Sequence, residues 1–282
     1  MHTTIIDTET VQQNSKHLDW RIIDCRFSLA DTEKGRLAYQ TSHLPNAVYA
    51  HLDEDLSASI IPGQTGRHPM PTPETAAQTF SNWGIDGRVQ VVVYDDNVGQ
   101  VASRLWWMLR WLGHDHVAVM DGGWERWQKE ERSETADVPT IARRTFTPQV
   151  RYHTFTDVNH VDSVKKDPSY RLVDARAAAR FRGEVEPIDP VAGHIPGAVC
   201  GAFEDNIGPD GLMKSQKGLR DRFRRVIGDV DISHVICYCG SGVSACHNLL
   251  ALLHAGLGDA KLYPGSWSEW ITDPSRSVGK GK

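Results

Sequence analysis

Short runs of β-branched and aromatic residues alternate along the chain with segments of helical periodicity. In the C-terminal half, residues 235–238 form an apolar run typical of a buried strand, and residues 243–255 form a helical pattern that Gly256 ends. We expect further helices over 156–166, with Thr156 as the N-cap, and over 216–227, and further strands at 172–174, 198–199 and 261–263. Strands that alternate with helices in this way predict a parallel sheet with helices on both faces.

The same sequence landmarks occur twice, in the same order. The matching segments are 21–26 with 171–176, 43–48 with 194–199, and 91–94 with 235–238. The first pair shares a D-x-R motif and the second pair shares H-[IL]-P-x-A. Each half also ends with a pair of tryptophans, Trp124 and Trp127 in one and Trp267 and Trp270 in the other. We therefore predict two copies of one domain.

The predicted organisation is a first domain over 1–130, a linker over 131–152 and a second domain over 153–282. The linker is polar, carries Pro139 and Pro148 and shows little periodicity, so we expect it to be extended and to run along the surface. A length of 282 residues also favours two domains. The expected fold class is α/β, with two domains in tandem, each a parallel sheet flanked by helices.

Composition narrows the range of functions. With 31 Lys and Arg against 36 Asp and Glu, the formal net charge is -5, which argues against a protein that grips nucleic acid or an anionic membrane. No apolar run approaches the ~20 residues of a membrane span. The N-terminus has neither the basic nor the apolar region of a signal peptide. Five cysteines, an odd count, fit a reducing compartment better than a disulfide framework, so we expect a cytoplasmic protein.

The two copies differ in chemistry at one place. Ligands of such sheets bind at the carboxyl ends of the strands. After Tyr238 the chain reads C-G-S-G-V-S-A, whereas after Tyr94 it reads D-D-N-V-G-Q-V. A cysteine between a strand and a helix start meets free backbone N–H groups, which favour the reactive thiolate. We predict that Cys239 is a nucleophile and that the first copy has kept the scaffold without this chemistry.

The remaining cysteines are interpreted as structural. They are Cys25, Cys200, Cys237 and Cys246. A metal site built from Cys237, Cys239, Cys246 and His247 is disfavoured, because the spacing matches no usual zinc arrangement. We expect neither a metal nor a cofactor.

Several of these segments together resemble the tandem-domain rhodanese family of sulfurtransferases. They are the loop 239–245, both D-x-R motifs, both H-[IL]-P-x-A segments and the Trp-bearing end of each copy. Within the family the likeness is closest to the 3-mercaptopyruvate sulfurtransferases, whose loop C-G-S-G-V-T-A is matched with Ser244 in the Thr position. The resemblance covers nearly the whole chain and implies two rhodanese-like domains, with an active site on the second copy at the domain interface.

The resemblance implies a persulfide mechanism. The thiolate of Cys239 attacks the sulfur of 3-mercaptopyruvate, which leaves a persulfide and pyruvate. A thiol acceptor such as thioredoxin, or cyanide, then removes the outer sulfur. The loop residues expected to surround the substrate and the persulfide are Gly240, Gly242, Val243 and Ser244.

The family joins the loop serine to an acid and a histidine of the first copy as a proton relay. The serine is Ser241, and the best matches for the other two are Asp55 and His68. Asp53 remains a competitor for the acid, because the alignment needs a gap at this point.

The carboxylate of the substrate also needs a cation. The resemblance indicates Arg180 as its anchor, with Arg182 as a second candidate. Family members of this type often carry another arginine in the acidic loop that follows, but residues 186–193 contain none. Arg176 is assigned to the structural D-x-R motif.

Three alternatives stay open. A Cys-x5-Arg phosphatase needs an arginine at the position of Ala245, and is therefore disfavoured. A thiosulfate sulfurtransferase is the close rival, although the uncharged loop fits a monoanionic keto acid better than the thiosulfate dianion. A non-catalytic persulfide carrier would keep the same loop, and donor turnover separates it from an enzyme.

Overall fold

The computed structural model describes residues 1–281 and divides into two compact units. The first unit comprises residues 1–58 and 70–151, and the second comprises 59–69 and 152–281. The predicted division into 1–130, 131–152 and 153–282 places residues 59–69 in the first domain, whereas the structure packs them with the second unit. The segment predicted as a linker runs along the first unit, where the backbone N–H of Gln149 donates to the carbonyl of Leu112 at 2.8 Å.

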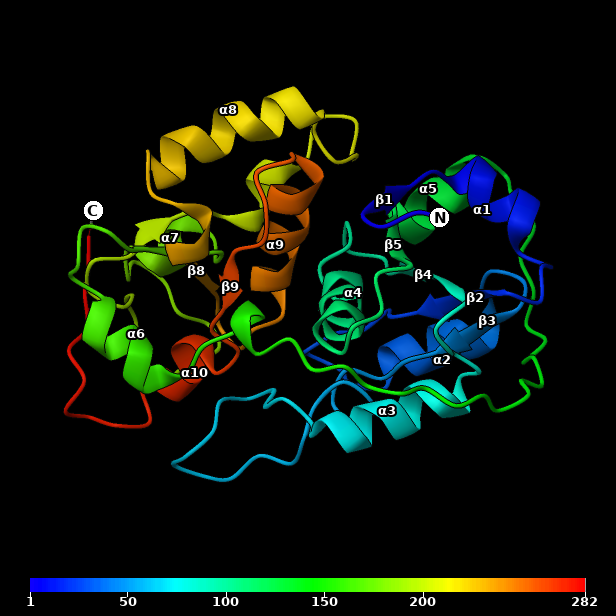
Figure 1. Cartoon of the computed structure of the whole chain (residues 1–282), viewed down its shortest axis with the longest axis horizontal. Coiled ribbons are helices and arrows are strands. Elements are labelled where there is room, and N and C mark those ends of the chain that lie inside the picture. Colours follow the sequence, from blue (N-terminus) through cyan, green and yellow to red (C-terminus); the bar gives the residue numbers. More distant parts are fainter. Residues whose placement is uncertain (282) are drawn as a thin grey trace. The chain divides into compact units, whose positions relative to one another are not determined.

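The first unit is a parallel five-stranded sheet in the order β1-β5-β4-β2-β3, flanked by helices (Figure 1). Its strands are β1 (Ile5–Ile6), β2 (Trp20–Asp24), β3 (Ala47–Tyr49), β4 (Gln90–Tyr94) and β5 (Val117–Met120). Its helices are α1 (Thr8–Asn14), α2 (Lys34–Thr41), α3 (Pro73–Asn82), α4 (Ala102–Trp111) and α5 (Gly123–Lys129).

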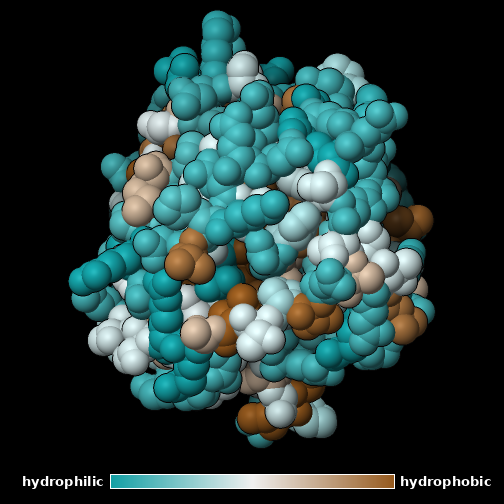
Figure 2. Space-filling model, turned by 90° about the vertical axis from the view of Figure 1, so that its right-hand side faces the viewer, coloured by the Kyte–Doolittle hydropathy of each residue, from teal (hydrophilic) through white to brown (hydrophobic). Residues whose placement is uncertain are grey.

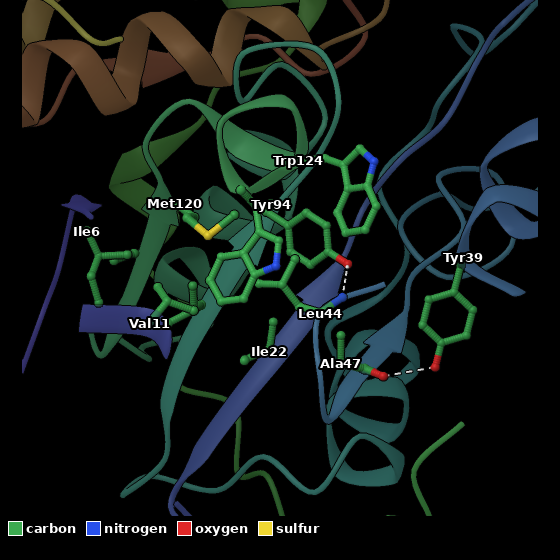
Figure 3. Close-up of a cluster of buried hydrophobic side chains, with 12 residues drawn as sticks. Ile6, Val11, Ile22, Tyr39, Leu44, Ala47, Tyr94, Met120 and Trp124 are labelled. Carbon is green, nitrogen blue, oxygen red and sulfur yellow. Dashed lines mark hydrogen bonds between the residues drawn. The ribbon is translucent and has the colours of Figure 1, made fainter. Parts of the chain in front are cut away.

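The central strand β4 is buried along its whole length. Alternate residues of a strand point to opposite faces, so both faces must be covered and the strand reads as a continuous apolar run. On one face Tyr94 lies in a cluster with Trp124 and Met120 (Figure 3). The hydroxyl of Tyr94 accepts the backbone N–H of Leu44 at 3.3 Å, which satisfies a polar group within this core.

The second unit is a parallel four-stranded sheet in the order β7-β6-β8-β9. Its strands are β6 (Arg171–Asp174), β7 (Val199–Cys200), β8 (Val235–Tyr238) and β9 (Lys261–Leu262). Its helices are α6 (Val158–Val164), α7 (Ala178–Phe181), α8 (Gln216–Ile227), α9 (Ser244–His254) and α10 (Ser266–Trp270). This architecture confirms the predicted α/β class of parallel sheets flanked by helices.

Helices cover both faces of the second sheet, because alternate residues of its strands point to opposite faces. Leu172 and Ile236 lie in one core cluster with residues of α6 and α10. Val173 points to the other face, since a Cβ added to Gly201 would lie 2.5 Å from its Cγ1 and 3.8 Å from Asn248 of α9. The sheet is thus covered on both sides, and the loop after β8 is held between well-packed elements.

Most elements of the second unit match the sequence prediction. Helix α8 and strand β8 have the predicted bounds, and α9 is one residue shorter at each end. The predicted cap of α6 is wrong: Asp157, not Thr156, caps the helix, and its carboxylate accepts the N–H of His160 at 2.9 Å. The N–H of Thr156 instead donates to the carbonyl of Leu262 at 2.8 Å, which keeps this residue alongside the end of β9.

The D-x-R motif of the second unit forms a buried ion pair at the end of β6. Asp174 accepts hydrogen bonds from the backbone N–H (3.0 Å), Nε (3.0 Å) and Nη2 (2.6 Å) of Arg176. Both side chains are almost fully buried, and the guanidinium lies 4.9 Å from the ring centre of Trp267. The Tyr238 hydroxyl, beside this pair, accepts the N–H of Ile195 at 3.1 Å.

The first unit repeats this network. Arg26 donates to Asp24 through the same three groups, and its guanidinium lies 4.3 Å from the ring centre of Trp124. The Tyr94 hydroxyl donates to Asp24 at 2.7 Å. Since the motif occurs in both units, including the one without the cysteine, it belongs to the scaffold.

The face of the molecule shown in Figure 2 is mainly hydrophilic, with hydrophobic residues in small separate groups. Within residues 1–281 no helix combines the length and the apolar character that crossing a membrane requires.

We predict that Asp174→Ala destabilises the second unit by about 3–5 kcal/mol, because the buried guanidinium of Arg176 loses its nearest carboxylate and keeps the more distant Glu186 at 3.3 Å. Urea unfolding followed by tryptophan fluorescence measures the change. The matched control is Asp221→Ala, which removes an acid paired with Lys217 on the exposed face of α8 and should leave the curve unchanged. Equal midpoints for Asp174→Ala and the wild type would contradict the structural role.

Candidate active site

Cys239 lies directly after β8, in the loop that leads into α9, and its side chain is buried. The first turn of α10 binds the carbonyls of this loop: the N–H of Trp267 donates to Cys239 O at 3.0 Å, and the N–H of Ser268 donates to Gly240 O at 2.9 Å. In a planar trans peptide the N–H points opposite to the C=O. The amides of Gly240 and Ser241 are therefore directed away from α10.

The sulfur itself has a backbone donor. The N–H of Gly242 points to Cys239 Sγ at 3.2 Å, and the start of α9 follows directly. Gly242 has a φ of 76°, and a Cβ there would lie 2.3 Å from the carbonyl oxygen of Pro264, so only glycine fits this turn. N–H groups and the positive end of the helix dipole favour a sulfur anion at this place.

The equivalent loop of the first unit shows what such a turn binds. Asp95 follows β4 as Cys239 follows β8, and its buried carboxylate accepts four backbone N–H groups at 2.7–2.9 Å. The donors belong to Asn97, Gly99, Val101 and Ala102. Burial raises the pKa of Asp95, and these hydrogen bonds oppose the shift. The turn is thus an anion-binding turn in the unit that lacks the thiol.

The predicted serine and histidine meet within the second unit. Ser241 Oγ lies 2.7 Å from His68 Nδ1, and both side chains are buried. His68 reaches this position because segment 59–69 packs with the second unit. Next to it, the N–H of Arg67 donates to Ser268 Oγ at 3.1 Å, which anchors the segment to α10.

The two acids considered for the relay belong to the first unit. The Asp55 carboxylate accepts the N–H of His51 at 2.8 Å, and burial raises its pKa. Asp53 is exposed. The choice between Asp55 and Asp53 stays a prediction from the resemblance.

Arg180 is held by two acids of the loop that follows α7. Its Nη2 lies 2.7 Å from Glu186 Oε1 and 3.2 Å from Asp189 Oδ2. Burial opposes ionisation of Glu186, but hydrogen bonds from Arg180 and from backbone N–H groups give it a lowered pKa. Arg182, the second candidate, pairs with Glu184 at 2.6 Å, and both side chains are largely exposed.

Arg67 is the residue that sequence reasoning missed. It forms an ion pair with Asp189, so that this acid contacts both Arg67 and Arg180. A Cβ added to Gly240 would lie 2.8 Å from Arg67 Nη2 and 3.7 Å from Arg180 Nη2. Two guanidinium groups therefore flank the residue that follows Cys239. A sequence feature that could have indicated Arg67 as a site residue is its position directly before His68.

The remaining predicted contacts lie in the same loop. Gly240, Gly242 and Val243 form the turn, and Ser244 is the first residue of α9; Val243 and Ser244 are buried. Their contact with a substrate stays a prediction.

Burial makes two of the other cysteines, Cys25 and Cys237, poor nucleophiles. All five are free thiols in the described chain. Burial raises the pKa of Cys237 to about 12 and that of Cys25 well above its usual range, so both are unreactive thiols.

One group of side chains within residues 1–281 has the spacing of metal ligands, namely Glu33, His51 and Glu54 of the first unit. Arg36 pairs with both glutamates, at 2.9 and 2.6 Å. The Nδ1 of His51 lies 3.2 Å from the N–H of Asp53, and Nε2 lies 3.0 Å from the carbonyl of Thr32. Since Arg36 already pairs with both carboxylates, this group is an ion-pair cluster.

Comparisons with known proteins identify the family of the chain. The rhodanese-like domain matches residues 7–130 and 158–273. A probable 3-mercaptopyruvate sulfurtransferase of Pseudomonas aeruginosa is 45% identical over 276 residues, which cover 96% of this chain and 97% of the relative. Mouse thiosulfate sulfurtransferase is 33% identical over 93% of this chain and 89% of its own length.

Among solved structures, 3-mercaptopyruvate sulfurtransferase from Leishmania major superposes with a TM-score of 0.81 at 31% identity, over 95% of this chain and 74% of that one. The family match covers most of both halves, and the relatives are similar along nearly their whole length. The chain therefore belongs to the rhodanese family, with the rhodanese-like domain present in two copies.

Proposed function

We propose that this protein is a sulfurtransferase that moves sulfur from 3-mercaptopyruvate to a thiol or cyanide acceptor through a persulfide on Cys239. The observation that carries the proposal is the sulfur of Cys239 in an N–H-lined turn, with the Ser241–His68 pair in the same loop. The full-length similarity to sulfurtransferases supports an enzyme rather than a binding module.

In the first step the Cys239 thiolate attacks the thiol sulfur of the donor. The S–S bond forms as the carbon–sulfur bond of 3-mercaptopyruvate breaks, and the electron pair leaves as the enolate of pyruvate. The enolate takes up a proton, and the persulfide loses one to become Cys–S–S⁻. The N–H of Gly242 and the amides of the turn stabilise this anion, as the turn around Asp95 stabilises a carboxylate.

The Ser241–His68 pair supplies the proton. Its 2.7 Å hydrogen bond orients the Ser241 hydroxyl within the loop that holds the nucleophile, and His68 replaces the proton that Ser241 hands on. The resemblance adds an acid to this relay, with Asp55 as the first choice.

In the second step an acceptor thiolate or cyanide attacks the outer sulfur. The S–S bond breaks, and the electron pair returns to Cys239 as thiolate. Thioredoxin or a small thiol serves as the acceptor in this proposal. The cysteines of residues 1–281 are all free, which suits a reducing compartment such as the cytoplasm.

The charges beside the loop favour 3-mercaptopyruvate over thiosulfate. The two guanidinium groups next to Gly240, those of Arg67 and Arg180, are matched by the carboxylates of Glu186 and Asp189. The loop itself is uncharged. The site therefore has no excess of positive charge to balance a dianion such as thiosulfate. A monoanionic keto acid needs less positive charge for binding.

We expect Cys239→Ser to abolish pyruvate release from 3-mercaptopyruvate, because the hydroxyl cannot form the persulfide. Mass spectrometry of the wild-type protein after incubation with the donor should show one added sulfur on the peptide that contains Cys239. The matched control, Cys200→Ser, changes a half-buried cysteine outside the loop and should retain both signals.

The same preparations decide the donor. A higher kcat/KM for thiosulfate with cyanide than for 3-mercaptopyruvate would make the protein a thiosulfate sulfurtransferase. Loading of Cys239 from another persulfide protein, with no turnover of either small donor, would make it a carrier.

Ser241→Ala and His68→Asn should each lower kcat for pyruvate release about 100-fold, since each removes one member of the proton relay. The second step needs no proton from this pair. Sulfur already loaded on Cys239 from polysulfide should therefore pass to cyanide at the wild-type rate. The control variant His153→Asn changes an exposed histidine. Equal slowing of both steps would show that the pair only maintains the loop.

A further inference from the structure

The first unit contains a cavity of about 400 Å³ at the amino end of β2. Its walls come from parts of 15–21 and 139–144 and from Asn46. Strand β2 begins at this cavity, and the turn that holds Asp95 lies at the other edge of the sheet, where the parallel strands end. The volume falls within the roughly 300–1,000 Å³ of small-molecule sites. The cavity is therefore large enough for a small ligand, and the loops that follow the strands do not form it.

The ionisable side chains that line this cavity are all basic or neutral. Among the described residues no carboxylate lines it, and the four ionisable lining residues are Lys16, His17, Arg21 and Arg144. The remaining walls are largely apolar and include the ring of Trp20 and the side chains of Leu18 and Ile141. In a protein with a formal net charge of -5, such a wall is selective for an anion that also has an apolar part.

Arg21 is the lining cation that lacks a counter-ion. It is only 9% exposed, and its Nε is buried without a hydrogen-bond partner within residues 1–281. Burial and the nearby charge of Arg144 both lower the pKa of the Arg21 guanidinium. Arg144 differs, because Asp19 and Asp86 pair with it at 3.0 and 3.3 Å. A buried cation without an anionic partner is costly to the fold, so a bound anion would be strongly favoured beside Arg21.

The second copy offers an internal comparison. Arg171 begins β6 in the position that Arg21 has in β2, and its Nε is also buried without a partner in the described chain. Arg171 as a whole is more exposed than Arg21. The segment 139–144 makes the difference in the first copy: a Cβ added to Gly84 would lie 2.7 Å from Ile141 Cγ2 and 3.1 Å from Arg21 Nη2. This segment thus buries Arg21 and brings a second guanidinium, that of Arg144, to the same cavity.

We propose that this cavity binds a small organic anion, whose carboxylate or phosphate group meets Arg21 and whose apolar part lies against Trp20 and Ile141. The inference goes beyond sulfur transfer and does not depend on it. A guanidinium suits either anion, because its planar N–H donors match two oxygens of a carboxylate or a phosphate. Lys16 lies on the exposed rim and adds a charge that attracts the ligand.

The test titrates phenyl phosphate, benzoate and inorganic phosphate into the full chain by isothermal titration calorimetry. At least one of the two aromatic anions should bind the wild type at one site and more tightly than inorganic phosphate, because the apolar walls contribute. Arg21→Met should weaken this binding about 10- to 100-fold, since a charge-assisted hydrogen bond is lost. The matched control Arg171→Met, at the equivalent place in the second copy, should bind as the wild type does. Tighter binding of phenyl phosphate would identify a phosphate ligand, and tighter binding of benzoate a carboxylate.

Three results would overturn the proposal. The first is that no aromatic probe binds at millimolar concentration, or that inorganic phosphate binds more tightly than both. The second is equal affinity in Arg21→Met and the wild type, because the anion would then bind elsewhere, for example beside Cys239. The third is a clearly lower Tm of ligand-free Arg21→Met, because the guanidinium would then serve the fold.

A second variant keeps the test decisive should Arg21→Met fail to fold. Lys16 is exposed, so Lys16→Glu leaves the core of the first unit unchanged. The reversed charge at the rim should weaken binding of the same probe about 3- to 10-fold at low salt. Unchanged affinity in Lys16→Glu would place the bound anion outside this cavity and would overturn the proposal.

Discussion

The turn after the central strand of each sheet gathers backbone N–H groups that need an anion, and the rest of the structure follows from this requirement. In the first unit Asp95 supplies a carboxylate and satisfies four of them. In the second unit the sulfur of Cys239 takes that place, with the N–H of Gly242 directed at it. One scaffold therefore holds either a buried carboxyl group or the sulfur of a cysteine at the same place.

The elements around the turn keep its amides directed inward. In each unit a tryptophan N–H binds the carbonyl of the first loop residue: Trp124 binds Asp95, and Trp267 binds Cys239. The same tryptophan stacks on the arginine of the buried D-x-R pair. The ion pair below the sheet end and the geometry of the loop are thus parts of one packed assembly, which explains why both copies keep them although only one carries the thiol.

The sequence predicts what short-range patterns encode. The apolar run of β8 and the helical face of α8 are local, and both appear with the predicted bounds. The resemblance pointed to Ser241 and His68 as partners, and these two side chains meet. Arg67 was missed because its contact with Asp189 joins segments far apart in the chain, and no periodicity records such a meeting. The cap of α6 went to Asp157 rather than Thr156 because a backbone bond to Leu262 holds Thr156 beside β9.

Segment 59–69 lies inside the first copy along the chain but packs with the second. The unit that carries the nucleophile is therefore discontinuous, and Arg67 and His68 are encoded well upstream of the rest of it. In genetic terms the duplicated halves are not interchangeable modules. A gene fragment that begins at the second copy would encode Cys239 and Ser241 without His68, the partner of Ser241.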